Sequence, residues 1–249
     1  MTPADLLWAF DDTAAPFCPF DLSHLAVLTF LVVLCGSFQL LRHRLSASVR
    51  QACRWIMAIL LVGNDLLVHL WVYRQGQWSP RSMLPVQLCD LSIYLGAVML
   101  VTRSRRLYEY VYFLGVGGGV PSLLTPDLGA EEGFPQYLFF QYFICHGLIV
   151  VAPLYMTLVE GYRPTWKSVI QVIVGVNLYL PCVALLNMVV GGNYLFLCGK
   201  PGNPTLFDLL GDWPWYLVSM EVLGLLIVLL LYSPFAIHDW WQPARRTLP

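Results

Sequence analysis

The sequence has little charge for its length. Its 249 residues include 14 Lys and Arg and 15 Asp and Glu, so 12% of the chain is charged while 58% is apolar. An average soluble domain is about 25% charged, so the shortage of charge excludes a soluble domain. The apolar content excludes a disordered chain, and the net charge of −1 excludes the basic surface of a nucleic-acid binder. An integral membrane protein remains, with membrane phospholipids as its partners and no nucleic acid.

Long apolar segments are the feature that the sequence does have. Seven of them are long enough to cross the hydrocarbon core of a bilayer, which is about 30 Å thick. They cover residues 20–41, 52–73, 83–101, 107–124, 136–159, 168–190 and 215–237. Glycines interrupt the fourth, which a membrane helix tolerates where neighbouring helices cover its backbone. The sequence predicts one all-α membrane domain over residues 1–249, a polytopic protein with seven transmembrane helices.

The placement of Lys and Arg predicts the orientation of these helices. Cytoplasmic loops carry the excess of Lys and Arg in membrane proteins. With the N-terminus outside and the C-terminus in the cytoplasm, all Lys and Arg except Arg74, Arg81 and Lys200 lie on the cytoplasmic side. We expect a multi-pass protein of the cell membrane, and more specifically of the bacterial inner membrane. The three outside cations either hold a lipid head-group phosphate or anchor the chain at the interface.

Cysteine and metal motifs give little support to a disulfide framework or a zinc site. The chain has seven cysteines and no CxxC or HExxH motif, so we predict no metal and no cofactor. Cys18 and Cys198 both lie outside in the predicted orientation. They form either a disulfide bridge or two free thiols.

Polar residues inside the predicted spans are costly in lipid, which makes each a functional candidate. They are Asn64, Asp65, His69, Gln87, Cys89, Asp90, Gln141, His146, Asn177, Asn187 and Glu221. In the predicted orientation, polar groups from several helices share the outer half of the bilayer. This predicts a polar cavity open to the outer leaflet or the outer solvent.

Two pairs among these residues have both a chemical and a structural interpretation. Asp65 and His69 are spaced i,i+4 on one helix face, so they either orient an imidazole or bond a neighbouring helix. Cys89 and His146 fit a nucleophile and its base, because a thiol needs a base to supply the thiolate. Alternatively, Cys89 is a small buried apolar side chain and His146 a bond between helices.

Three motifs carry a resemblance to a known family. They are Leu84-Pro85-Val86-Gln87-Leu88-Cys89-Asp90, then Tyr142-Phe143-Ile144-Cys145-His146-Gly147, then Asn193-Tyr194 with Lys200-Pro201 and Trp213-Pro214-Trp215-Tyr216. Together they resemble the bacterial branch of the transmembrane protein 164 family, from about the second predicted span to the seventh. The resemblance implies a compact helical membrane protein. From the animal members it implies an acyltransferase that moves a fatty acyl chain between phospholipids without coenzyme A.

The resemblance also implies site residues. The family's cysteine nucleophile and histidine fall on Cys89 and His146 of this sequence. One position departs from the pattern, because a histidine is expected two residues before the cysteine and Gln87 stands there. Glutamine cannot serve as a base, but it can donate a hydrogen bond to an oxyanion.

The expected mechanism runs through a thioester on Cys89 with His146 as the general base. Gln87, Asn187 or a backbone N–H would stabilise the oxyanion. Asp65, His69 and Asp90 would support the site, and Glu221 would position His146.

Other function classes stay open at this point. With water as the acceptor, the same Cys89 and His146 pair would make a phospholipid hydrolase. A small-solute or ion transporter would use Asp65, Asp90, His146 and Glu221 as a relay. A seven-helix ligand receptor would not depend on Cys89.

Overall fold

The computed structural model describes residues 16–129, 132–200 and 206–241. Across these ranges the ordered elements are helices, with no strand. The all-α prediction is thereby confirmed, and the long apolar helices among these elements support a polytopic membrane protein. Pro201 of the third motif and the basic residues Arg245 and Arg246 lie outside the described residues.

Five described helices are long and apolar enough to cross a membrane. They are α2 (Leu22–Leu41), α3 (Ala47–Arg74), α7 (Tyr137–Leu158), α8 (Trp166–Val190) and α9 (Trp215–Trp241). Each overlaps one predicted span, and the ends differ by five residues or fewer, as at the start of α3. In α9 the most apolar stretch has no buried residue, so much of its apolar surface lies on the outside of the molecule.

The other two predicted spans correspond to shorter elements. The third is α4 (Leu88–Thr102), whose 15 residues reach about 22 Å at 1.5 Å per residue. Residues 83–87 of that predicted span are not helical, because Gln87 caps the start of α4. The fourth consists of α5 (Arg105–Val111), the π-helical turn η1 (Tyr112–Val116) and α6 (Gly117–Leu124), which follow without a break. The count of seven spans and the orientation therefore stay predictions.

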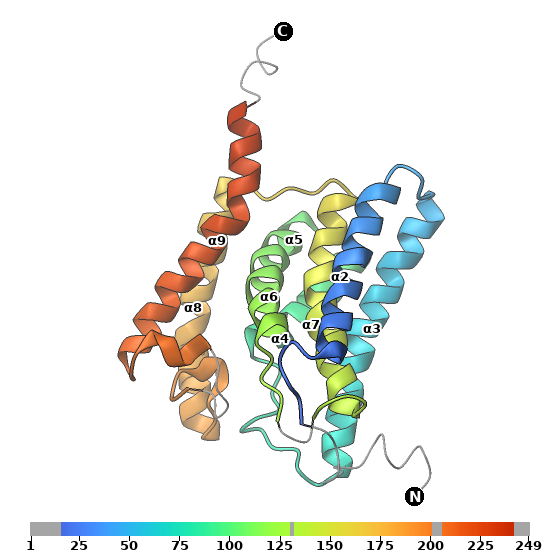
Figure 1. Cartoon of the computed structure of the whole chain (residues 1–249). Coiled ribbons are helices and arrows are strands. Elements are labelled where there is room, and N and C mark those ends of the chain that lie inside the picture. Colours follow the sequence, from blue (N-terminus) through green and yellow to red (C-terminus); the bar gives the residue numbers. More distant parts are fainter. Residues whose placement is uncertain (1–15, 130–131, 201–205, 242–249) are drawn as a thin grey trace, which may run out of the picture.

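Helix α7 is the centre of the arrangement. It packs against α2, α3, α4, η1 and α6, and Figure 1 shows α8 and α9 lying as a pair to one side of this group. Two 3-10 turns, η2 (Tyr194–Phe196) and η3 (Leu206–Leu210), lie between α8 and α9 in the chain. Buried His24 ties α2 to the end of α6, because its Nε2 donates to the carbonyl oxygen of Leu123 at 2.8 Å.

The glycine run lets α6 approach its neighbours closely. A Cβ on Gly115 would lie 2.4 Å from the carbonyl oxygen of Ile149 on α7, and a Cβ on Gly119 would lie 2.6 Å from Val150 Cγ2. Real side chains do not approach so closely, so only glycine permits this packing of η1 and α6 on α7. Every residue of η1 is buried, so neighbouring helices cover the backbone of this turn.

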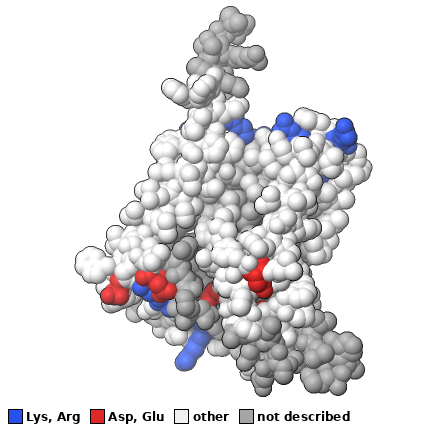
Figure 2. All heavy atoms as spheres, viewed as in Figure 1, with Lys and Arg blue, Asp and Glu red and all other residues white. Residues whose placement is uncertain are grey.

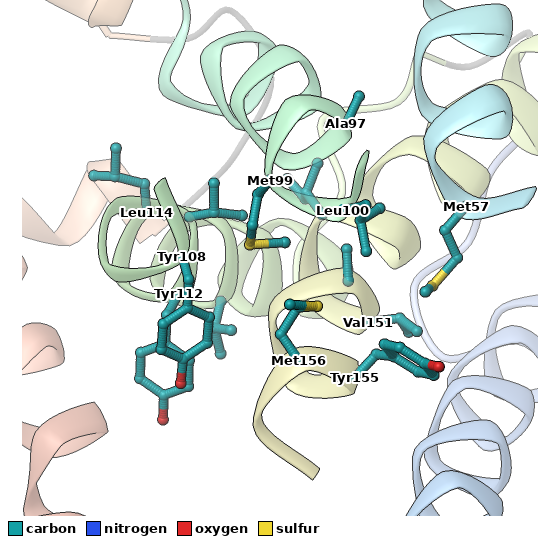
Figure 3. Packing of buried hydrophobic residues seen from close by; sticks show 14 of the residues in the cluster. Met57, Ala97, Met99, Leu100, Tyr108, Tyr112, Leu114, Val151, Tyr155 and Met156 are labelled. Atoms are coloured by element: carbon teal, nitrogen blue, oxygen red, sulfur yellow. The ribbon is translucent and has the colours of Figure 1, made fainter. Parts of the chain in front are cut away.

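The main core lies where α3, α4, η1 and α7 meet (Figure 3). Met99 and Leu100 of α4 and Tyr155 and Met156 of α7 are wholly buried there. A membrane protein gains little hydrophobic free energy from such burial, since lipid tails are themselves apolar. Close van der Waals packing and hydrogen bonds are the stabilising interactions.

Charged side chains gather at the two ends of the molecule. Figure 2 shows Lys and Arg along the end where α2 joins α3, whereas Asp and Glu group toward the other end with a few basic side chains. At the basic end, Glu160 is paired with Arg54, and its other carboxylate oxygen lies 3.7 Å from Arg103 Nη2. The two ends of the molecule therefore differ in charge (Figure 2).

The glycine packing yields a stability prediction. Gly115→Ala places a methyl group against the backbone of α7, so it should lower the free energy of unfolding by about 1–3 kcal/mol. Gly63→Ala is the matched control: it lies inside α3 with nothing within 4 Å of its Cβ position, and it should raise stability by about 0.5–1 kcal/mol. Thermal and denaturant unfolding in detergent measures both. Equal stabilities for the two variants would contradict the close approach.

Candidate active site

One cavity collects most of the polar residues that the sequence singled out. It has a volume of about 190 Å³ and lies between α3, the segment before α4, α4 itself and α7. Its polar and thiol-bearing lining residues are Asp65, His69, Ser82, Gln87, Cys89, Asp90, Gln141, Cys145 and His146. Both members of the proposed nucleophile and base pair therefore border the same cavity.

The start of α4 positions Cys89. Gln87 is the N-cap and forms a capping box with Asp90, whose Oδ2 accepts from the Gln87 backbone N–H at 3.2 Å. The Gln87 side chain accepts from the backbone N–H of Asp90, and Cys89 lies in the same first turn of α4, where the N–H groups of Leu88 and Cys89 have no helical acceptor. Those donors, with the partial positive charge of the helix end, face any negative charge that develops there.

Gln87 also joins α4 to a distant loop. Its Oε1 accepts from the backbone N–H of Leu195 at 2.8 Å. The carbonyl end of this amide is thus occupied, and Nε2 is the end that can donate to an oxyanion.

His146 is held in a defined tautomer. Its Nδ1 lies 3.0 Å from the carbonyl oxygen of Tyr142, and a carbonyl oxygen only accepts, so Nδ1 carries the proton. In the neutral ring, Nε2 then holds the lone pair of a base. The Tyr142 ring stacks on the imidazole with centroids 4.0 Å apart, and its hydroxyl donates to the carbonyl oxygen of Ser122.

Consecutive glycines of α6 adjoin the two candidate residues. A Cβ on Gly118 would lie 3.9 Å from Cys89 Sγ, and a Cβ on Gly119 would lie 3.4 Å from the backbone oxygen of His146. α6 thus packs against both α4 and α7 at the depth of the cavity, and Gly118 places no side chain beside the Cys89 sulfur.

The carboxylate of Asp65 is the centre of a second polar network. Oδ2 accepts from the hydroxyl of Tyr94 at 2.5 Å and lies 3.8 Å from His69 Nε2. The indole N–H of Trp78 donates to His69 Nδ1 at 3.1 Å. In neutral His69 the proton is therefore on Nε2, the atom facing Asp65. The expected i,i+4 pair is present, and Tyr94 extends it to a neighbouring helix.

Cys145 is a cavity residue that the sequence did not single out. Its sulfur accepts from Asn64 Nδ2 at 3.1 Å and from Gln141 Nε2 at 3.8 Å. The signal was present, because Gln141 and Cys145 are spaced i,i+4 on one helix face. Tyr94 and Tyr142 were missed as well, since tyrosines are common in membrane helices without a polar role.

Two expected site residues lie elsewhere. Asn187 makes two hydrogen bonds with the backbone of Tyr194, holds the loop after α8, and does not line the cavity. Glu221 accepts from Asn177 at 2.7 Å and lines a different cavity. The expectation that it positions His146 is wrong, because the carbonyl of Tyr142 does so.

The three outside cations differ in their surroundings. Arg81 directly precedes Ser82 and Met83, which line the cavity, and its guanidinium lies beside Gly191. The Lys200 ammonium lies 5.9 Å from the centre of the Tyr216 ring, and Arg74 is exposed at the end of α3. Of the three, Arg81 is the one adjacent to the cavity.

The remaining cysteines and the possible metal ligands form neither a disulfide nor a metal site in the described residues. Cys18 and Cys198 are free thiols in the structure, which is the unbridged one of the two expected alternatives. Within the described ranges, no group of three or more His, Cys, Asp or Glu side chains is placed to hold a metal ion.

Comparison with known proteins identifies one family. The family model described as the TMEM164 family matches residues 19–232, the family that the three motifs resemble. No curated protein and no solved structure matches the chain.

The Asp65 and Tyr94 bond predicts a measurable coupling. Tyr94→Phe removes a donor from a buried carboxylate and should lower the free energy of unfolding by about 1.5–3 kcal/mol. In a double-mutant cycle with Asp65→Ala, the two losses should fall short of additivity by about 0.5–3 kcal/mol. Tyr110→Phe is the control, since its exposed hydroxyl makes only a 3.4 Å contact with the Gln171 carbonyl. Additive losses would remove Tyr94 from the network.

Proposed function

The chain belongs to the TMEM164 family, and from this premise we propose that it is a membrane-embedded lipid acyltransferase. It moves a fatty acyl chain between phospholipids without coenzyme A, through a thioester on Cys89. The observation that carries the proposal is that Cys89 and His146 border one polar cavity while the Nδ1 bond of His146 leaves Nε2 free as a base. We further propose seven spans in a bacterial cell membrane, with the N-terminus outside.

The first half-reaction forms the thioester. His146 Nε2 takes the proton from Cys89 Sγ, and the thiolate attacks the ester carbonyl carbon of a phospholipid. The new C–S bond forms, the ester C–O bond breaks, and the proton on Nε2 passes to the departing oxygen. The products are a lysophospholipid and the acyl-enzyme.

The second half-reaction reverses these roles. The hydroxyl of another lysophospholipid gives its proton to His146 Nε2 and attacks the thioester carbonyl. The C–S bond breaks, and the proton returns to Cys89 Sγ. Atoms and charges balance over the cycle without coenzyme A.

Oxyanion stabilisation falls to the start of α4. Two donors suit the role: the backbone N–H groups of the first turn, which include Cys89 itself, and Nε2 of Gln87. Preorganised donors of this kind lower a barrier because they need no rearrangement when charge develops. Arg81, next to the cavity-lining residues, would hold the phosphate of the donor lipid.

Two alternatives use the same residues. A phospholipid hydrolase differs only in the acceptor, because water would take the acyl chain from Cys89. A proton or cation relay would need Asp65, Asp90, His146 and Glu221 in sequence. It has less support, because Glu221 lies at a different cavity from the other three.

Reconstitution tests the proposed function. The purified protein is placed in vesicles of dialkyl ether phosphatidylcholine, which has no ester to donate, with an ester-linked phosphatidylcholine donor and a labelled lysophospholipid acceptor. Wild type should transfer the acyl chain to the acceptor, and acid-quenched protein should carry a hydroxylamine-sensitive acyl group on Cys89. Cys89→Ala should abolish transfer, and His146→Ala should slow it by about 10²–10⁴-fold.

The control variant is Cys182→Ala, which removes an exposed thiol on α8 and should leave transfer unchanged. Release of free fatty acid in place of the labelled product would identify the hydrolase. Transfer that persists in Cys89→Ala, or wild type with neither product nor adduct, would contradict the proposal.

A further inference from the structure

A second cavity lies behind the candidate nucleophile. It has a volume of about 170 Å³ and lies between η1, α6, α8 and α9. Its wall is apolar, with Phe113, Val176 and Ile227 among its lining residues. Its two polar side chains, Asn177 and Glu221, are hydrogen-bonded to each other.

This cavity reaches the residues next to the Cys89 sulfur. Leu88, the neighbour of Cys89 in the chain, lines it, and so does Gly118. The Cβ position of Gly118 is 3.9 Å from Cys89 Sγ, and that position is empty because the residue is glycine. Cys89 therefore lines the polar cavity that His146 borders, and the residues beside it, Leu88 and Gly118, line the apolar cavity.

We propose that the apolar cavity, here termed the acyl cavity, receives the fatty acyl chain while it is bound to Cys89. This inference rests on the proposed function. In the thioester the acyl carbon is bonded to Sγ, so the chain must leave the sulfur in a direction away from His146 and the oxyanion donors. The empty space at Gly118 provides that direction.

The size of the acyl cavity suits the first part of a chain. A dry apolar cavity of about 150 Å³ holds a molecule the size of benzene, so about 170 Å³ accommodates the first several carbons after the carbonyl. The remaining methylenes continue between α8 and α9 into the bilayer, because the exposed faces of those helices are apolar. The inference therefore predicts selection for chains that are long and apolar.

A larger groove elsewhere does not fit this role. It has a volume of about 950 Å³ and lies between α2, α3 and α7. The α7 residues that line it include Phe143, Gly147 and Leu148, whereas the polar cavity is lined by Cys145 and His146 on another face of α7. Neither Cys89 nor its neighbours border the groove, so a chain attached to the sulfur has no route into it.

The test fills the acyl cavity without touching Cys89. Gly224→Leu adds a side chain at a lining position with nothing within 4 Å of its Cβ, and Val176→Phe enlarges a lining side chain. The matched controls are Gly36→Leu, which has equally open surroundings on α2, and Val174→Phe, a half-exposed α8 position. Neither control residue lines the acyl cavity.

The readout is the acyl adduct on Cys89, measured by mass after acid quenching, in dialkyl ether phosphatidylcholine vesicles. The vesicles carry an equal mixture of phosphatidylcholines bearing butanoyl or hexadecanoyl esters. Wild type and both controls should favour the hexadecanoyl adduct. Gly224→Leu and Val176→Phe should lower the ratio of hexadecanoyl to butanoyl adduct by about tenfold or more, as expected when methylene-sized space is lost from an apolar site.

The outcomes separate the two proposals. No adduct of either length on wild-type Cys89 would overturn the proposed function and the acyl cavity with it. Adducts whose length ratio is the same in wild type, Gly224→Leu and Val176→Phe would overturn the acyl cavity alone. An equal fall of the ratio in the controls would also overturn it, because the effect would not come from the cavity.

Discussion

The close approach of η1 and α6 to α7 is the constraint on which the rest of the structure depends. At Gly115 a single methyl group would collide with the carbonyl of Ile149. In a bilayer the hydrophobic effect does not drive helices together. Close van der Waals contact between helix backbones therefore supplies much of the attraction between them. The same contact sets the depth at which α6 meets α4 and α7. The polar cavity, with Cys89 and His146 at its border, lies at that depth.

Cys89 lines one cavity and adjoins residues that line an unlike one, which matches the unlike parts of a phospholipid ester. The polar cavity offers a base, amide donors and carboxylates, and the acyl cavity offers an apolar wall. A thioester has the same division between its carbonyl and its chain. The two ring nitrogens of His146 differ because Nδ1 donates a hydrogen bond to the carbonyl oxygen of Tyr142. Nε2 is therefore the nitrogen that can take a proton. The Asp65, Tyr94 and His69 network stiffens the other side of the polar cavity.

Sequence reasoning placed several parts of this arrangement and misplaced others. Costly polar residues in membrane spans are informative because lipid offers them no partner, and Asp65, His69, Gln87, Cys89, Asp90 and His146 do border one cavity. The same reasoning failed for Asn187 and Glu221. Their partners are the backbone of Tyr194 and the side chain of Asn177, and which of several polar groups pair depends on helix rotation. The hydropathy of a segment does not predict how its helix is rotated about its own axis.

The sequence by itself determined that this is a polytopic helical membrane protein. A chain with so few charges and so many long apolar segments is stable only in a bilayer, where helices satisfy their own backbone hydrogen bonds. It also determined the family, through motifs around Cys89 and His146. Only the tertiary structure decided which polar residues share a cavity, which nitrogen of His146 is free, and which glycines face α7 rather than the sulfur. Those properties depend on the rotation and spacing of packed helices, which are set by contacts between residues far apart in the chain.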